Sequence, residues 1–118
     1  MPHMLLIHEP VGQRATRSEA EGRELYERML RWGEELRSRG LLLAAESLAS
    51  TDGAARVTAA GGKARIVDGP FAEAKEMVGG FFLVNVDSRE EAIALAQQCP
   101  AAQWATVEVR GLGPCFAR

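Results

Sequence analysis

Cysteine and histidine are scarce in this sequence, and their scarcity excludes proteins built around a closed zinc site. Two cysteines and two histidines occur in 118 residues, and Cys99 and Cys115 lie at the opposite end of the chain from His3 and His8. A closed zinc site needs four such ligands within reach of one another, so no metal site is predicted. A disulfide and two free thiols are both compatible with the sequence. We expect free thiols, because a chain of this length gains less from a cross-link than a miniprotein does.

Long apolar runs and an excess of one charge are also absent. The longest internal apolar run, residues 41–45, is far shorter than the ~20 residues of a membrane span. The N-terminus lacks the basic lead of a signal peptide. Fourteen basic residues against sixteen acidic ones give a net charge of −2, and the two signs are interleaved. Without the basic stripe that nucleic acid requires, we expect a cytoplasmic protein with neither a nucleic-acid nor a membrane partner.

The residues that are present suffice for one apolar core. Apolar residues make up 47% of the 118 positions, which predicts a single domain over residues 1–118. That length leaves no room for a separate cofactor domain, and no cofactor is predicted.

Two segments have the capping and periodicity of helices. One begins at Ser18, which forms a capping box with Glu21, and ends at Gly40. The other begins at Ser88 and ends before Pro100. The apolar face of the longer helix consists of Leu25, Met29, Trp32 and Leu36, and Trp32 is predicted to lie in the core.

Six short segments have strand character, and their order predicts the fold. They are Met4–His8, Leu42–Leu48, Ala55–Ala59, Ala64–Val67, Gly80–Val86 and Trp104–Arg110. Gly61-Gly62 suits a tight turn between the third and fourth, so these two are predicted to form an inserted β-hairpin. The remainder reads βαββαβ, the α+β ferredoxin-like arrangement with both helices on one face of an antiparallel sheet.

Side-chain alternation predicts which residues lie on the uncovered face of that sheet. Because successive side chains of a strand point to opposite faces, the expected set comprises Met4, Leu6, His8, Leu42, Ala44, Glu46, Leu48, Phe81, Leu83, Asn85, Trp104, Thr106, Glu108 and Arg110. This face is too apolar to stay in water, so a second copy of the chain is expected to cover it. His8, Glu46, Asn85 and Glu108 are then either site residues in apolar surroundings or solvated rim residues.

One ten-residue segment resembles a known family. Residues 67–76 read VDGPFAEAKE, the signature of the YCII-related (DGPF-domain) proteins, and MLLIH, GGFFLVNVDSREEAIALA and VEVR occur where the family has similar segments. The resemblance implies a ferredoxin-like fold that pairs into a dimeric α+β barrel. It implies less about chemistry: some relatives resemble small lyase-like enzymes of aromatic degradation, and many are encoded beside extracytoplasmic-function sigma factors.

Asp68 in this motif has two interpretations. As a structural residue it caps a short helix at about Ala72–Met77. As a functional residue it is a general base, with the Lys75 ammonium stabilising an anionic substrate. The resemblance implies a His and Asp pair, and the segment Gln13–Tyr26 contains no histidine, so His8 is predicted to pair with Asp68 as the catalytic residues. The predicted substrate-binding residues are Glu46, Lys75, Phe81, Trp104 and Glu108.

Three functions are compatible with these features. The first is a small cofactor-free enzyme, a lyase or isomerase, that transfers a proton on an apolar or anionic compound in a cavity of the homodimer. The second is a non-catalytic small-molecule-binding or regulatory module of a sigma-factor system. The third, a cofactor-independent monooxygenase, depends on fold analogy alone.

Overall fold

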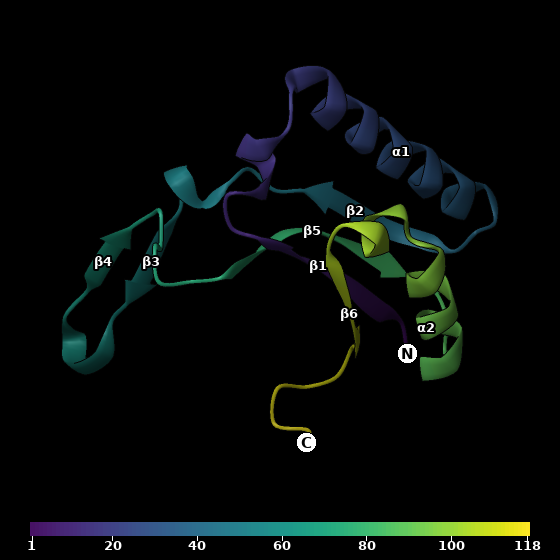
Figure 1. The fold of residues 1–118 in the computed structure, drawn as a ribbon. Helices are drawn as coiled ribbons and strands as arrows, with labels where there is room; N and C mark the ends of the chain where they lie inside the picture. The colour runs from purple at the N-terminus through teal and green to yellow at the C-terminus, as the bar shows by residue number, and fades with distance from the viewer.

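Four strands form one antiparallel sheet, with two helices packed on one of its faces. The computed structural model describes residues 1–118 and orders these strands β2-β5-β1-β6 (Figure 1). The elements are β1 (His3–Pro10), α1 (Glu19–Ser38), β2 (Leu42–Ser47), β5 (Glu76–Val84), α2 (Arg89–Gln98) and β6 (Thr106–Gly111). The chain is therefore α+β, and this order is compatible with the expected ferredoxin-like fold. Neither helix is long and apolar enough to cross a membrane.

The helices begin where their capping residues predict. Ser18 Oγ accepts the Glu21 N–H at 3.1 Å, while the Ser18 N–H donates to Glu21 Oε1 at 3.0 Å. This capping box lowers the pKa of Glu21, because the ionised carboxylate accepts those hydrogen bonds. Gly40 ends α1 with φ +72°, and Ser88 caps α2 by accepting the Glu91 N–H.

The core lies between the helices and the sheet. Trp32 of α1 is 7% exposed and packs edge-on against Phe82 of β5, with ring centroids 4.9 Å apart. This confirms the core position predicted for Trp32. Around the pair lie Leu5, Ile7, Leu36, Val84, Val86, Ala92, Leu95, Ala96, Cys99 and Ala101. The two cysteines are free thiols, Cys99 buried and Cys115 exposed.

A β-bulge in β2 places one residue on the face of the sheet opposite to the predicted one. Leu42 was predicted on the uncovered face, but the register with β5 shifts between Leu42 and Ala44, and the Leu42 side chain packs against the helix-side core. One extra residue reverses the alternation before it. Beyond the bulge the prediction holds, since Glu46 pairs with Phe81, whose neighbour Phe82 is buried under α1.

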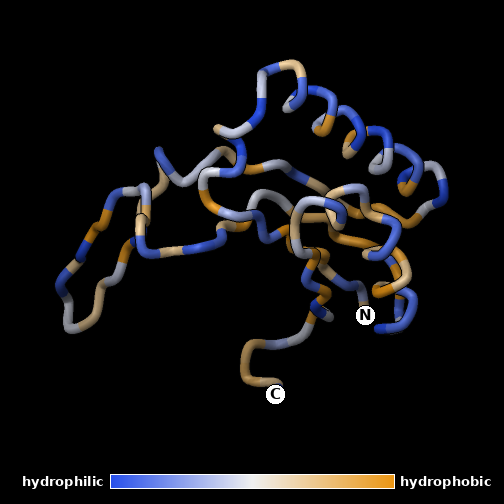
Figure 2. Tube along the Cα trace, in the orientation of Figure 1, coloured by the Kyte–Doolittle hydropathy of each residue, from blue (hydrophilic) through white to orange (hydrophobic).

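A separate two-stranded sheet projects from the body (Figures 1 and 2). Its strands β3 (Ala55–Thr58) and β4 (Arg65–Asp68) consist of exposed residues only, Val57 and Ile66 included. The radius of gyration, 16.1 Å, reflects this projection, since a compact chain of this length has about 13.5 Å.

The segment after β4 does not form the predicted short helix. Residues 72–73 form a turn, and β5 starts at Glu76, opposite Pro10 of β1. The Val11 N–H donates to the Lys75 carbonyl at 2.9 Å, which draws this segment alongside β1. Pairing with β1 thus replaces the helix that the Asp68-Gly-Pro sequence predicts on local grounds.

Candidate functional site

A hydrogen-bonded histidine and glutamate lie on the face of the sheet that the helices leave uncovered. In β1, Leu5 and Ile7 are buried under the helices, so His8 points to the opposite face. On β6, Glu108 pairs with Leu6 and lies diagonally across from His8. His8 Nε2 is 2.6 Å from Glu108 Oε1, and the side chains are 26% and 43% exposed. The fold thus joins two predicted site residues that are 100 positions apart in the sequence.

The hydrogen bond between His8 and Glu108 determines which nitrogen of the histidine carries the proton. An ionised carboxylate only accepts hydrogen bonds, so Nε2 carries the proton that it donates to Glu108. In the neutral imidazole Nδ1 then holds a lone pair, and no group of the chain bonds to it. Arg110 Nε lies 3.9 Å from the other carboxylate oxygen of Glu108. The arrangement is that of a general base with a carboxylate that orients it.

His8 lines a recess of about 280 Å³ between the sheet and the DGPF segment. Phe71 of that segment is 6% exposed, and the Arg56 guanidinium stacks on its ring at 3.7 Å. Gly69 lets the segment approach closely, because a β-carbon there would collide with the Thr51 carbonyl. The recess therefore combines a histidine with a cation in its lining, Arg56, which also pairs with Glu73 at 3.6 Å. Its remaining lining residues are Val11, Thr51, Ala74, Glu76, Met77 and Val78.

The other predicted residues on the uncovered side do not all join this recess. Phe81 lies between Leu6 and Glu46 on the uncovered face, as predicted, and Glu46 is exposed without a partner. Lys75 is exposed and is absent from the recess lining, where Arg56 provides the cation. Arg56 gives no sequence signal, because it is 48 positions from His8 and lies in an exposed hairpin strand.

Asp68 makes no hydrogen bond or ion pair with His8 within the chain, and the predicted catalytic pair stays a prediction. Its carboxylate has neither a hydrogen bond nor an ion pair, so it caps no backbone group. The reason is topological: Asp68 ends β4 in the projecting hairpin, opposite Ala55, whereas His8 lies in the main sheet beside β6.

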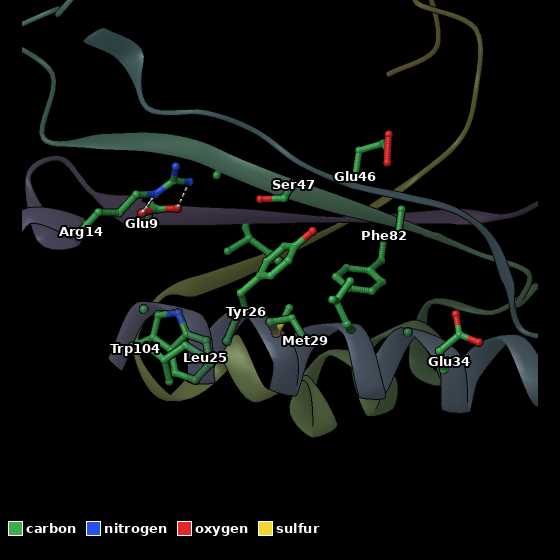
Figure 3. A pocket seen from close by; sticks show the side chains of 18 of the residues that line it. Glu9, Arg14, Leu25, Tyr26, Met29, Glu34, Glu46, Ser47, Phe82 and Trp104 are labelled. Carbon is green, nitrogen blue, oxygen red and sulfur yellow. Dashed lines mark hydrogen bonds and ion pairs between the residues drawn. The ribbon is translucent and has the colours of Figure 1, made fainter. Parts of the chain in front are cut away.

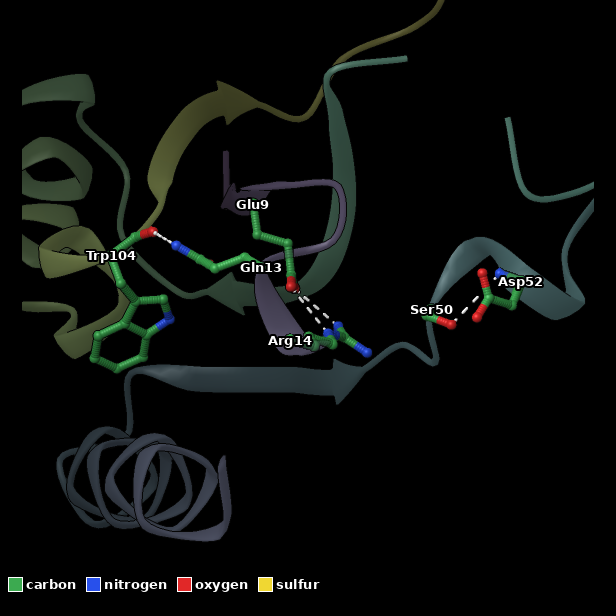
Figure 4. Close-up of polar contacts among 6 residues, drawn as sticks. All are labelled: Glu9, Gln13, Arg14, Ser50, Asp52 and Trp104. Carbon is green, nitrogen blue, oxygen red and sulfur yellow. Dashed lines mark hydrogen bonds and ion pairs between the residues drawn. The ribbon is translucent and has the colours of Figure 1, made fainter. Parts of the chain in front are cut away.

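Trp104 lies on the helix side of the sheet, not on the uncovered face as predicted. It lies between the short 3-10 helix Pro100–Gln103 and β6, outside the strand, where side-chain alternation does not apply. The Arg28 guanidinium lies over its ring at 5.4 Å, and the Gln13 side chain donates to its carbonyl at 2.9 Å (Figure 4). Trp104 thereby lines a second cavity of about 410 Å³, between α1 and the sheet.

A partly buried ion pair that the sequence did not indicate lies in this second cavity (Figures 3 and 4). Arg14 donates from Nε and Nη2 to the two carboxylate oxygens of Glu9, at 2.9 and 2.8 Å. Glu9 is 10% exposed, and its hydrogen bond raises the pKa of Arg14. The carboxylate lies so close to β5 that a β-carbon at position 79 would displace it. The signal available in the sequence was the pair of opposite charges Glu9 and Arg14, five residues apart on either side of the turn at Pro10–Gly12.

Fold and site together define a small α+β protein whose sheet carries helices on one face and a histidine–glutamate pair on the other. Comparison with known families is more specific. Residues 1–114 match the family described as the YCII-related domain, and the chain belongs to this family.

One relative shares part of the sequence. An uncharacterized protein of Rhizobium meliloti (strain 1021) is 39% identical over 67 residues, which cover 55% of this chain and 54% of the relative. The match therefore spans about half the length of that relative.

Proposed function

We propose that this YCII-related protein is a small cofactor-free enzyme that transfers a proton on an apolar or anionic compound. The observation that carries the proposal is the 2.6 Å bond between His8 Nε2 and Glu108 Oε1 at the edge of the recess. It leaves the basic nitrogen of His8 unpartnered beside a cavity that also contains a cation.

In the proposed reaction, His8 Nδ1 removes a proton from a carbon next to a carbonyl group. Glu108 stabilises the imidazolium that forms, and Arg56 stabilises the negative charge that develops on the substrate oxygen. Return of the proton to another carbon completes an isomerisation, whereas loss of a leaving group completes a lyase reaction. Both outcomes use the same first step.

The site is proposed to be closed by a second copy of the chain, in a dimeric α+β barrel. Met4, Leu6, Phe81 and Leu83 are only half-buried on the uncovered face. The accessible surface of the single chain is 8098 Å², against about 6,300 Å² for a compact monomer of this mass. The excess, about 1,800 Å², is larger than the area of about 800 Å² that each partner buries in a standard interface, and it supports a homodimer.

Exchange of carbon-bound hydrogen tests this proposal without knowledge of the product. The protein is incubated in D2O with small acids that have an acidic C–H beside a carbonyl group, phenylpyruvate and acetoacetate among them, and proton NMR follows loss of the C–H signal. We expect exchange above the buffer rate for at least one acid. His8→Gln should lower that rate by about 10²–10⁴-fold, and Glu108→Gln should lower it less.

Glu90→Gln, an exposed change in α2, is the matched control and should exchange at the parental rate. Exchange that persists unchanged in His8→Gln would overturn the proposed base. Saturable binding of these acids with no exchange would instead favour the non-catalytic binding module.

A further inference from the structure

The cavity between α1 and the sheet exists because only half of α1 packs on the sheet. The buried residues of this 20-residue helix, Trp32, Gly33 and Leu36, all lie in its C-terminal half. In the N-terminal half, Tyr26 and Leu30 remain 52% and 51% exposed although both line the cavity. The volume of about 410 Å³ falls within the range of small-molecule sites.

The walls of this cavity are apolar and aromatic. Tyr26 and Met29 of α1 lie on one side, and Phe82 of the sheet lies on the other, with Trp104 at one end (Figure 3). A gap lined by the three aromatic side chains Tyr26, Phe82 and Trp104 fits a planar apolar group, which would replace water against these surfaces.

The unpartnered polar groups at one end of the cavity are nearly all hydrogen-bond donors. Arg17 lines the cavity, makes no ion pair, and is tied to Arg14 by a backbone hydrogen bond of 3.3 Å. Arg14 uses Nε and Nη2 for Glu9, which leaves Nη1 free, and no hydrogen bond occupies the Trp104 indole N–H. Several free donors around one position favour an anionic acceptor.

The carboxylates near the cavity do not cancel this positive end. Glu9 is neutralised by Arg14, and Glu34 pairs with Arg37 at 3.5 Å. Glu46 points away from the cavity, across the strands from α1 (Figure 3). Arg17 makes no ion pair, although the Glu21 carboxylate lies close enough for the two charges to interact.

We infer that this cavity is a binding site for a planar apolar compound with a single carboxylate. The ring lies between Tyr26, Phe82 and Trp104, and the carboxylate accepts hydrogen bonds from Arg17 and Arg14. The site is on the helix side of the sheet, opposite His8, so it is separate from the proposed proton-transfer site.

Calorimetry with trans-cinnamate as the probe tests this inference, with cinnamamide as its neutral isostere. We expect saturable binding of cinnamate with a Kd of about 1 mM or lower, and binding of the amide at least about tenfold weaker. Arg17→Gln should weaken cinnamate binding at least about tenfold. In two-dimensional NMR, the indole signal of Trp104 should shift on addition of cinnamate and that of Trp32 should shift less.

Two control variants separate this site from its surroundings. Arg23→Gln removes an exposed arginine of the same helix that pairs with Glu19, and it should bind cinnamate as the parent does. His8→Gln should also bind normally. Gly22→Leu places a side chain in the cavity lining, where a β-carbon at this position meets no atom within 4 Å, and it should block binding without unfolding the chain. Equal binding of acid and amide, normal binding by Arg17→Gln, or no binding by the parent would overturn the inference.

Discussion

Asp68 has a carboxylate that makes no contact within the chain, which makes its substitution informative. Because no hydrogen bond or ion pair is lost, Asp68→Asn should leave the free energy of unfolding unchanged within about 0.5 kcal/mol. Urea unfolding measures this. A loss of more than about 1 kcal/mol would restore the capping role.

The same variant tests Asp68 as a catalytic group. If Asp68→Asn stays folded and loses about 10²-fold or more in hydrogen exchange, its carboxylate takes part in the reaction. Exchange at the parental rate would leave His8 and Glu108 as the reacting pair. The catalytic role of Asp68 stays a prediction until this is measured.

The buried thiol of Cys99 leads us to predict that the protein loses stability at alkaline pH. Burial raises the pKa of its thiol from 9.0 to about 11. Below pH 9 the folded and unfolded chains both keep this proton, so there is no effect. Between pH 9 and 11 the unfolded chain releases the proton first, and folding should lose up to about 2–3 kcal/mol.

Urea unfolding from about pH 8 to 11 measures this loss. Cys99→Ala should lose correspondingly less stability over the same range than the parent. Cys115→Ser, which alters an exposed thiol, should keep the parental pH dependence. Parallel losses in the parent and Cys99→Ala would contradict the assignment.

At the scale of elements, the β3–β4 hairpin is the most exposed part of the sheet structure. An isolated two-stranded hairpin is marginally stable in water, and all eight strand residues here are exposed. We predict that hydrogen exchange of the backbone amides of residues 55–68 is slow in the dimer and fast in a monomeric variant. Mass spectrometry measures both, with β1 as the protected reference. Equal protection in monomer and dimer would show that the hairpin needs no partner.

For the whole molecule, the prediction is self-association through the uncovered face. Leu83 pairs with Met4 on one side and Ala44 on the other, at the centre of this face. The parent should sediment as a dimer at micromolar concentration, with an interface of at least about 1,600 Å². Leu83→Lys should be a folded monomer, because Leu83 contributes nothing to the core under the helices.

Ala94→Lys places the same charge on the exposed side of α2 and should remain a dimer. A parent that sediments as a monomer would rule out both the dimer and the closed cavity proposed with it.

The sequence by itself determined the elements, because helix caps, apolar periodicity and strand alternation act over a few residues. Ser18, Gly40 and Ser88 bound the helices where local hydrogen bonding requires, and Trp32 follows from its spacing with Leu36. The DGPF motif is likewise contiguous. Each of these features could be identified without knowledge of the residues that pack against it.

Only the tertiary structure decided which side chains meet. The bulge after Leu42 and the turn before Trp104 reverse faces that alternation predicts, and pairing with β1 replaces a local helix with β5. Glu108, not Asp68, reaches His8 because β6 lies beside β1 in the sheet. These outcomes depend on register and strand order, which arise from contacts between distant residues, and a local pattern contains no information about them.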